Sequence, residues 1–354
     1  MYLVDKTSSR SITYGEAIYE ATYQEMERDE NVIVLGLGAD DPKGLFGSTK
    51  DLHTFFGSHR SFDTPLSEDG MTGVAIGAAL AGLRPIHVHQ RMDFVLLCMN
   101  QLVNLAAKTS YMFAGKQSVP LVVRNVIGRS WGQGAQHSQA FHSFFMHVPG
   151  LKVVAPTTPY DAKGTLISSI RENNPVIFVE HRMLYEIKGI VPEEPFAVPL
   201  GKGRILAEGD DITIIGISHM VAEALRAAAH LKEVGITAEV IDPVTLYPMD
   251  IDLIASSVLK TGRLLVIDCG WLNCGASAEI ITQVFEKLQE EKSFRAARMG
   301  FAETPCPTTK NLENIFYPSA KTIAMRAYKL INMKEDWIPV SEEAKEIVAF
   351  RGPF

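Results

Sequence analysis

The sequence predicts an α/β protein with two doubly wound domains, each built on a mainly parallel sheet with helices on both faces. Short apolar runs of strand length alternate with helical patterns along most of the chain, and this alternation is typical of parallel sheets. The alternation stops once, at a stretch rich in proline and glycine that reads as an extended linker. We therefore expect a first domain at residues 1–187, a linker at 188–206, a second domain at 207–334 and a C-terminal tail at 335–354.

The first domain shows the alternation most clearly. Its helical patterns lie at about 12–28, 73–83, 94–112 and 159–173, and its strand patterns lie at 31–38, 84–90, 119–126, 150–156 and 174–181. Pro159 stands near the start of the last of these helices, where a missing N–H is tolerated.

The second domain repeats the pattern in a shorter form. Strands are expected at 211–217, 236–243 and 263–270, and helices at 219–235, 250–262 and 276–291. Gly235 and Gly262 follow runs rich in alanine and leucine, so we expect them to end their helices.

Composition excludes several classes of protein. The net charge of −7 argues against a general nucleic-acid binder, which would carry a basic excess. No run of about 18 apolar residues occurs, so no membrane span is expected, and the N-terminus lacks the apolar core of a signal peptide. The four cysteines form no CxxC pair, so we expect reduced thiols in a cytoplasmic protein.

Two adjacent acids precede a helical pattern in "FDTPLSEDGMTG", residues 62–73. Asp69 stands directly before the expected helix, where a capping role is natural. Glu68 is less well placed to cap the same helix. We expect it where a strand-like segment reaches the end of a sheet, and ligand sites of α/β proteins gather there. The pattern alone leaves Glu68 one candidate acid among many.

Gly73 and Gly77 lie four residues apart on one face of the helix that follows. Small residues at this spacing allow another backbone to come close. The spacing favours tight helix packing within the domain, with a contact between subunits as the alternative.

A glycine-rich loop at 128–139 matches neither the GxxxxGK[ST] nor the GxGxxG spacing, so it is not a nucleotide loop. His137 ends this loop, where a histidine is usually exposed or hydrogen-bonded and only sometimes functional. His142 and His147 follow at intervals of five residues, which does not stack side chains on one helix face. We therefore expect no metal site there.

The other histidines and cysteines give no better metal pattern. His87 and His89 share one face of a predicted strand, and a polar strand end beside a site is favoured over a metal pair. Cys269 and Cys274 have the wrong spacing for a zinc ribbon. We expect no metal ligands in this chain. GxSxG and HExxH are absent as well, which removes the main support for hydrolase and zinc-protease readings.

Several long segments together resemble the β subunit of thiamine-diphosphate-dependent 2-oxoacid dehydrogenases, the decarboxylating component of pyruvate and branched-chain 2-oxoacid dehydrogenases within the transketolase-like superfamily. The similarity covers most of residues 11–330 and implies a pyrimidine-binding domain followed by a transketolase-type C-terminal domain. The matching segments are "FDTPLSEDGMTGVAIGAALAGLRPI", "NQLVNLAAKTSYM", "GAQHSQAFHSFFMHVPGLKVVAPTTPYDAKGTLISSIRENNPVIFVEH", "GDDITIIG", "VIDPVTLYPMD" and "KTGRLLVID".

The resemblance implies roles for three residues. Glu68 matches the glutamate that hydrogen-bonds N1′ of the cofactor's aminopyrimidine, and Phe94 matches the aromatic residue that stacks on that ring. His137 matches the histidine placed to stabilise or protonate the substrate-derived intermediate, or to assist acyl transfer. Glu68 and His137 are therefore the expected catalytic residues.

The resemblance also implies partners. In such enzymes a GDG motif with a downstream asparagine holds the diphosphate and its Mg²⁺, and no GDG occurs in this chain. That motif belongs to an α subunit, so an α₂β₂ heterotetramer is expected, with the Gly73/Gly77 helix as a credible contact. A lipoyl acyltransferase is a further expected partner.

The sequence departs from the family pattern on the expected substrate side. Leu37 and Gly38 stand where an acidic pair is usual. His89, Gln90 and Arg91 make the segment before Phe94 more polar than usual.

Two further departures lie later in the chain. Arg129 enters the glycine-rich loop where smaller residues are common, and Asp268-Cys269 replaces a frequent His-Glu pair. We take His89, Gln90, Arg91 and Arg129 as candidates for contacting the substrate, since an arginine can pair with a carboxylate or phosphate.

The expected function is the decarboxylation of a 2-oxoacid and transfer of its acyl group to a lipoyl carrier. A transketolase-like or decarboxylating carboligase that transfers the unit to an aldehyde is one alternative. A scaffold or regulatory subunit with a degenerate site is another, motivated by Leu37 and Gly38.

Overall fold

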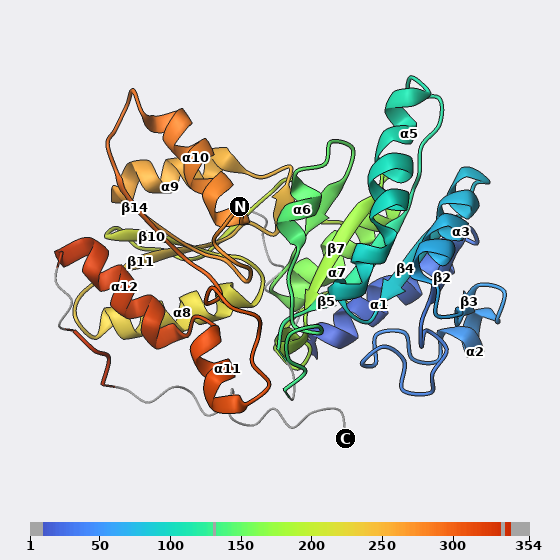
Figure 1. Ribbon diagram of the computed structural model, residues 1–354, viewed down its shortest axis with the longest axis horizontal. Helices are drawn as coiled ribbons and strands as arrows, with labels where there is room; N and C mark the ends of the chain where they lie inside the picture. Colours follow the sequence, from blue (N-terminus) through green and yellow to red (C-terminus); the bar gives the residue numbers. More distant parts are fainter. Residues whose placement is uncertain (1–9, 130–131, 334–336, 341–354) are drawn as a thin grey trace. The chain divides into compact units, whose positions relative to one another are not determined.

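The computed structural model describes residues 10–129, 132–333 and 337–340 (Figure 1). They divide into two compact units that interleave along the chain. The first unit comprises the residues up to 128, 144–200 and 245–248, and the second comprises 129–143, 201–244 and the residues from 249 onward. Two short segments thus belong to a different unit from their neighbours in sequence.

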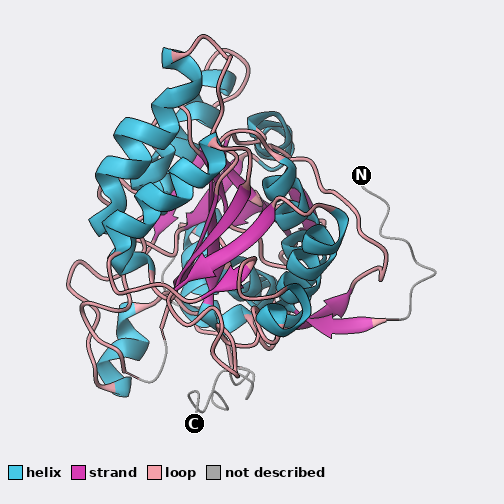
Figure 2. Ribbon diagram, turned by 90° about the vertical axis from the view of Figure 1, so that its right-hand side faces the viewer, coloured by secondary structure: helices cyan, strands magenta, loops and turns pink. Residues whose placement is uncertain are grey.

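The first unit is built on a seven-stranded sheet in the order β12-β6-β7-β5-β4-β2-β3. Neighbouring strands are parallel, except that β12 runs antiparallel to β6. The strands are β2 (Val32–Gly36), β3 (Ser61–Phe62), β4 (Arg84–His89), β5 (Val122–Ile127), β6 (Lys152–Val154), β7 (Val176–His181) and β12 (Thr245–Tyr247). The predicted parallel α/β architecture is confirmed, and Figure 2 shows strands running between helices on both sides.

Local signals fix the ends of the long helices of this unit. Thr13 and Glu16 form a capping box at the start of α1 (Tyr14–Arg28). Thr158 caps α7 (Pro159–Arg171), whose first residue is Pro159, as predicted. These two helices pack against each other (Figure 1). The other helices are α2 (Leu52–Phe56), α3 (Glu68–Leu80), α4 (Met92–Val95), α5 (Ala107–Met112) and α6 (His142–Met146), the last of which begins within the second unit.

The helical segment predicted at 94–112 is present, and residues 92–112 are helical without a break, but not as one regular α-helix. The chain passes from α4 through a 3₁₀ turn (Leu96–Cys98) and a π-helix (Gln101–Ala106) into α5. A π turn holds one more residue than an α turn. Over so short a stretch this barely changes the spacing of apolar residues, so periodicity does not reveal it.

The second unit is built on a five-stranded sheet in the order β14-β13-β10-β11-β9, parallel except for β9. Its strands are β9 (Arg204–Ala207), β10 (Ile212–Gly216), β11 (Ala238–Asp242), β13 (Arg263–Ile267) and β14 (Arg295–Met299). Its helices are α8 (His219–Lys232), α9 (Ile251–Thr261), α10 (Ala276–Leu288), α11 (Lys310–Phe316) and α12 (Ala320–Asn332). Gly262 is the left-handed C-cap of α9, as predicted, whereas α8 ends three residues before Gly235.

Three further differences from the sequence prediction concern single segments. The expected linker at 188–206 is partly paired backbone, since β8 (Lys188–Ile190) pairs with β1 (Ser11–Thr13) and β9 begins at Arg204. Elements β14, α11 and α12 were not predicted. The expected tail lies outside the described residues except for 337–340.

The core of the first unit is apolar but contains one ion pair. Arg124 of β5 and Glu180 of β7 are fully buried, with 2.6 Å between Arg124 Nε and Glu180 Oε1. Ser48 accepts a further hydrogen bond from the guanidinium, and the Tyr185 hydroxyl donates to Glu180. Among the described residues, no helix is both long enough and apolar enough to cross a membrane.

Candidate active site

Glu68 is the first residue of helix α3, and this differs from the expected strand end. Strand β3 ends at Phe62, and the turn through Thr64 and Pro65 leads directly into the helix. Helix α3 starts five residues earlier than predicted because the turn closes at Ser67, which is the N-cap residue. The carboxylate of Glu68 is half-buried, and it makes no hydrogen bond or ion pair within the described chain.

The capping role predicted for Asp69 is wrong. Asp69 lies inside the first turn, and its Oδ1 accepts hydrogen bonds from the Gly70 amide at 2.7 Å and from the Ser67 hydroxyl at 3.3 Å. Both acids still benefit from their place, since negative charge is favourable at a helix N-terminus. The two carboxylates are thus separated: Asp69 is occupied locally and Glu68 is available.

Thr72 fixes the backbone of Glu68. Its hydroxyl donates to the Glu68 carbonyl at 2.7 Å and lies 3.3 Å from Nδ1 of His87 on β4. Burial lowers the pKa of His87 to about 4, so the ring is neutral near pH 7. Because the threonine proton goes to Glu68, Nδ1 of His87 must be the donor of the second bond. Sequence reasoning missed Thr72, although its position four residues after Glu68 was a usable signal.

Phe94 lies on α4, and its ring is 37% exposed. Cys98 follows one turn later and is fully buried. Burial, with smaller contributions from the charges of Glu68 and Asp69, raises the pKa of the Cys98 thiol to about 11. The start of α3 and the segment carrying Phe94 are therefore close enough to interact electrostatically.

Hydrogen bonds connect the residues that follow strands β2, β3 and β4. After β2, the Leu37 carbonyl accepts a hydrogen bond from the Gln90 side chain at 3.2 Å, and the Gly38 amide donates to Asp63 at 2.7 Å. Gly38 has a φ of +75°, which favours glycine, and a Cβ there would lie 2.9 Å from Nε2 of Gln90. Leu37 and Gly38 thus form a backbone turn held by Gln90 and Asp63.

Two polar candidates at the end of β4 and just after it are buried. His89 is buried beside His87, with ring centroids 4.3 Å apart, and burial holds its pKa well below the usual range. Arg91 is buried and donates to the Gly128 carbonyl at 2.8 Å. Of the candidates His89, Gln90 and Arg91, only Gln90 is exposed.

Arg129 and His137 belong to the second unit, whereas Glu68 and Phe94 belong to the first. The Arg129 guanidinium donates to Asn314 at 3.0 Å and lies 5.2 Å from the centre of the Tyr317 ring. His137 is half-buried in the loop that ends at α6. Gly132 and Gly134, both with positive φ, bring this loop against Thr308, where no side chain would fit.

The residues of the first unit fit one end of thiamine diphosphate. An available carboxylate suits the ring nitrogen of an aminopyrimidine, and a partly exposed phenyl ring offers a stacking face. Glu68 and Phe94 supply these two groups.

Comparisons with known proteins match both domains of the chain. Residues 10–188 match the transketolase pyrimidine-binding domain, and residues 201–323 match the transketolase C-terminal domain. The chain is 44% identical to the β subunit of acetoin:2,6-dichlorophenolindophenol oxidoreductase of Cupriavidus necator, with 91% of this chain and 98% of that protein covered. It is 40% identical to the mitochondrial β subunit of the pyruvate dehydrogenase E1 component of Mus musculus, with 91% of each covered.

One solved structure shares the fold. It is a split-gene transketolase in an inactive β₄ tetramer, with a TM-score of 0.74, 21% identity, and coverage of 91% of this chain and 99% of that one. Both domains and most of the length therefore match. The chain belongs to the family of transketolase-type β subunits that includes those of acetoin oxidoreductase and of the pyruvate dehydrogenase E1 component.

Proposed function

We propose that this chain is the β subunit of a thiamine-diphosphate-dependent dehydrogenase that decarboxylates a 2-oxoacid and passes the acyl group to a lipoyl carrier. The observation that carries this proposal is the available Glu68 carboxylate at the start of α3, near the segment of Phe94. The similarity to pyruvate dehydrogenase E1 β subunits supports it independently.

Glu68 would hold the pyrimidine end of thiamine diphosphate through N1′, and Phe94 would stack on the ring. When bound, this cofactor supplies a carbanion that attacks a carbonyl and an electron sink for loss of CO₂. The work of Glu68 is to share a proton with one ring nitrogen in a fixed geometry. Thr72 supports that geometry because it holds the carbonyl of the same residue. His137 is our candidate for exchanging a proton with substrate oxygen.

The chain is expected to carry half of the site. Its sequence contains no GDG, so we propose that an α subunit holds the diphosphate and Mg²⁺ in an α₂β₂ heterotetramer. A lipoyl acyltransferase is the proposed acceptor partner, and the cytoplasm is the proposed compartment.

A second candidate substrate is acetoin, a ketol. The β subunits of acetoin oxidoreductase from Cupriavidus necator and Bacillus subtilis are 44% and 41% identical to this chain, and the pyruvate dehydrogenase β subunits are 39–41% identical. Cleavage of acetoin leaves the same two-carbon unit as decarboxylation of pyruvate, so the pyrimidine side of the site would be unchanged. A carboligase that delivers the unit to an aldehyde remains a third candidate.

Substitution of Glu68 by Gln, assayed with the α partner, thiamine diphosphate and Mg²⁺, tests the catalytic role. We expect turnover of pyruvate, branched-chain 2-oxoacids or acetoin to fall by about 10²-fold or more, because a carboxamide cannot exchange the proton. Asp69→Asn is the matched control, since it removes the neighbouring charge in the same helical turn, and it should stay within about threefold of the unmodified enzyme.

Unchanged turnover in the Glu68→Gln enzyme would support the scaffold alternative instead. If the β chain turns over substrate without any α chain, the half-site proposal is wrong. The substrate screen decides whether the substrate is a 2-oxoacid or the ketol acetoin. Analysis of the products formed in the presence of an added aldehyde reveals a carboligase.

A further inference from the structure

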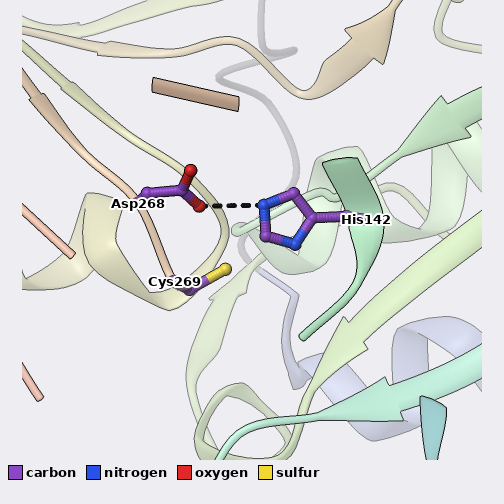
Figure 3. Close-up of side chains that lie close together, drawn as sticks. All are labelled: His142, Asp268 and Cys269. Carbon is purple, nitrogen blue, oxygen red and sulfur yellow. Dashed lines mark hydrogen bonds and ion pairs between the residues drawn. The ribbon is translucent and has the colours of Figure 1, made fainter. Parts of the chain in front are cut away.

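A second cluster of reactive side chains lies in the second unit, outside the site described above. His142 begins α6, and Asp268 and Cys269 directly follow β13 (Figure 3). All three are buried, and one donor atom from each lies within 4.8 Å of the other two. Within the described part of the chain this is the one group of three or more His, Cys, Asp or Glu residues with such spacing.

The cluster is already oriented. His142 Nε2 lies 2.8 Å from Asp268 Oδ1, and the other carboxylate oxygen accepts from the Ser277 amide at 3.1 Å. In Figure 3 the Cys269 sulfur points toward the space between the imidazole and the carboxylate. In metal sites, a hydrogen bond to the second oxygen of a ligating carboxylate commonly orients that ligand. The Ser277 amide gives Asp268 such a hydrogen bond.

Glycines make room for this arrangement. A side chain on Gly270 would come within 3.2 Å of His142 and 3.4 Å of Asp268, and one on Gly275 would come within 3.1 Å of Asp268. The backbone therefore passes close to His142 and Asp268, and a larger residue at either glycine would crowd these two side chains.

We propose that His142, Asp268 and Cys269 form a binding site for one divalent zinc-class metal ion. Imidazole, carboxylate and thiolate are the protein ligands of Zn²⁺. One thiolate and one carboxylate neutralise a divalent ion, so the occupied site places no net charge in the buried interior. Three protein ligands leave the fourth tetrahedral position to water or a small ligand.

Binding requires only small shifts. Tetrahedral zinc with bonds of about 2.0–2.3 Å separates its ligand atoms by roughly 3.3–3.6 Å, so the ion would spread the 2.8 Å pair of His142 and Asp268 and draw in the sulfur. Cys269 would release its thiol proton to solvent. The imidazole proton would move from Nε2 to Nδ1, an atom that is buried and has no hydrogen-bond partner among the described residues.

The local spacing of histidines and cysteines in the sequence gives no sign of this metal site. His142 and Asp268 are 126 residues apart, so no local ligand motif could mark them. An ion here would clamp the end of the loop that carries His137, five residues before His142, to the carboxyl end of β13.

Co²⁺ binding to the full-length chain tests the proposal, because thiolate ligation of Co²⁺ gives a charge-transfer band in the near ultraviolet. After treatment with a chelator, the chain should bind one Co²⁺, show this band, and lose it when one equivalent of Zn²⁺ is added. Cys269→Ser should abolish the band. Cys274→Ser, which changes an exposed thiol five residues away, should keep it.

His142→Gln gives a second readout that keeps all cysteines. We expect Zn²⁺ affinity, measured by competition with a chromophoric chelator, to fall at least tenfold. Absence of stoichiometric Co²⁺ or Zn²⁺ binding by the unmodified chain overturns the proposal without any variant. Retention of the band in Cys269→Ser, or unchanged affinity in a folded His142→Gln chain, overturns it as well.

Discussion

Arg124 and Glu180 show how much depends on single residues inside the first unit. Their side chains are fully buried and joined by two hydrogen bonds, of 2.6 and 2.9 Å. Desolvation of two charges offsets most of their attraction, so the pair contributes little net stability. Removing only one partner is different, because the remaining charge stays in the core unpaired.

Arg124→Met is therefore expected to destabilise the chain by about 3–5 kcal/mol. Chemical denaturation followed by circular dichroism measures the loss. The double variant with Glu180→Leu should recover much of the loss, since two apolar side chains can replace a buried pair. Equal stability of the single and double variants would contradict this account.

At the same scale, the sequence identified Glu68 through the resemblance of the surrounding segments and not through its spacing. The local pattern assigned the N-cap to Asp69, whereas Ser67 takes that position and the helix begins at Glu68. Other contacts near these sites join separate elements: Thr72 of α3 meets His87 of β4, and Arg129 meets Asn314 and Tyr317. Such contacts form only when the chain folds, and they cannot be predicted from the local residue pattern.

Among the elements, α3 presents an open face. A side chain added at Gly73 or Gly77 would meet nothing within 4 Å, so the packing within the domain that the spacing favoured is wrong. Val74 and Leu80 on the same helix are 54% and 46% exposed. The remaining interpretation of the two glycines, a contact with another subunit, stays a prediction.

Gly77→Ala and Gly77→Leu separate fold from assembly. In the chain alone, alanine should stabilise α3 by about 0.5–1 kcal/mol, because glycine is the poorer helix former and the space is free. Leucine should leave the chain folded but weaken association with the α subunit at least tenfold if a backbone packs there. Size-exclusion chromatography with light scattering measures association, and an intact complex with Gly77→Leu would refute the contact.

The predicted helices and strands are of the right type, whereas several of their ends lie elsewhere. The buried strands of both sheets are apolar runs bounded by turns, which sequence displays directly. The π-helix at Gln101–Ala106 and the strand–helix series from Arg295 onward lack such signals. Strand β14 has the sequence Arg-Ala-Ala-Arg-Met and is only partly buried, so neither an apolar run nor an alternating pattern marks it.

For the whole molecule, buried neutral histidines predict sensitivity to acid. Burial lowers the pKa of His87 to about 4, and burial together with the charges of Arg129 and Arg226 lowers that of His219 to about 3. The unfolded chain takes up these protons near pH 6.5 and the folded chain only at lower pH, so stability falls as pH decreases from about 6.5.

Each of the two histidines should contribute a loss of about 2 kcal/mol between pH 7 and pH 5. Burial raises the pKa of Glu223 and Glu313, which offsets part of the loss at the acid end. Calorimetry should find Tm several degrees lower at pH 5 than at pH 7.5. His87→Asn should reduce the difference, whereas His147→Gln, at an exposed position, should not. Equal Tm values at the two pH values would contradict the prediction.

The division of the whole molecule into two units is predicted only in part by the sequence. Alternating strands and helices indicate two sheets in chain order, and both sheets are present. They do not indicate that residues 129–143 and 245–248 belong to the unit opposite to that of their neighbours. Whether a residue belongs to one unit or the other depends on contacts between residues far apart in the sequence. The residue pattern within one helix or strand does not predict such contacts.

Because strand β12 lies far along the chain from the rest of its sheet, it affects how the first unit folds during translation. Thr245–Tyr247 completes the edge of the first sheet by pairing with β6, nearly a hundred residues earlier in the chain. While the ribosome makes the intervening residues, β6 presents an open row of amides and carbonyls, which is a template for pairing between nascent chains. A fragment that stops before β12 would keep that open edge permanently. Folding of the first sheet is thus completed only after much of the second has emerged.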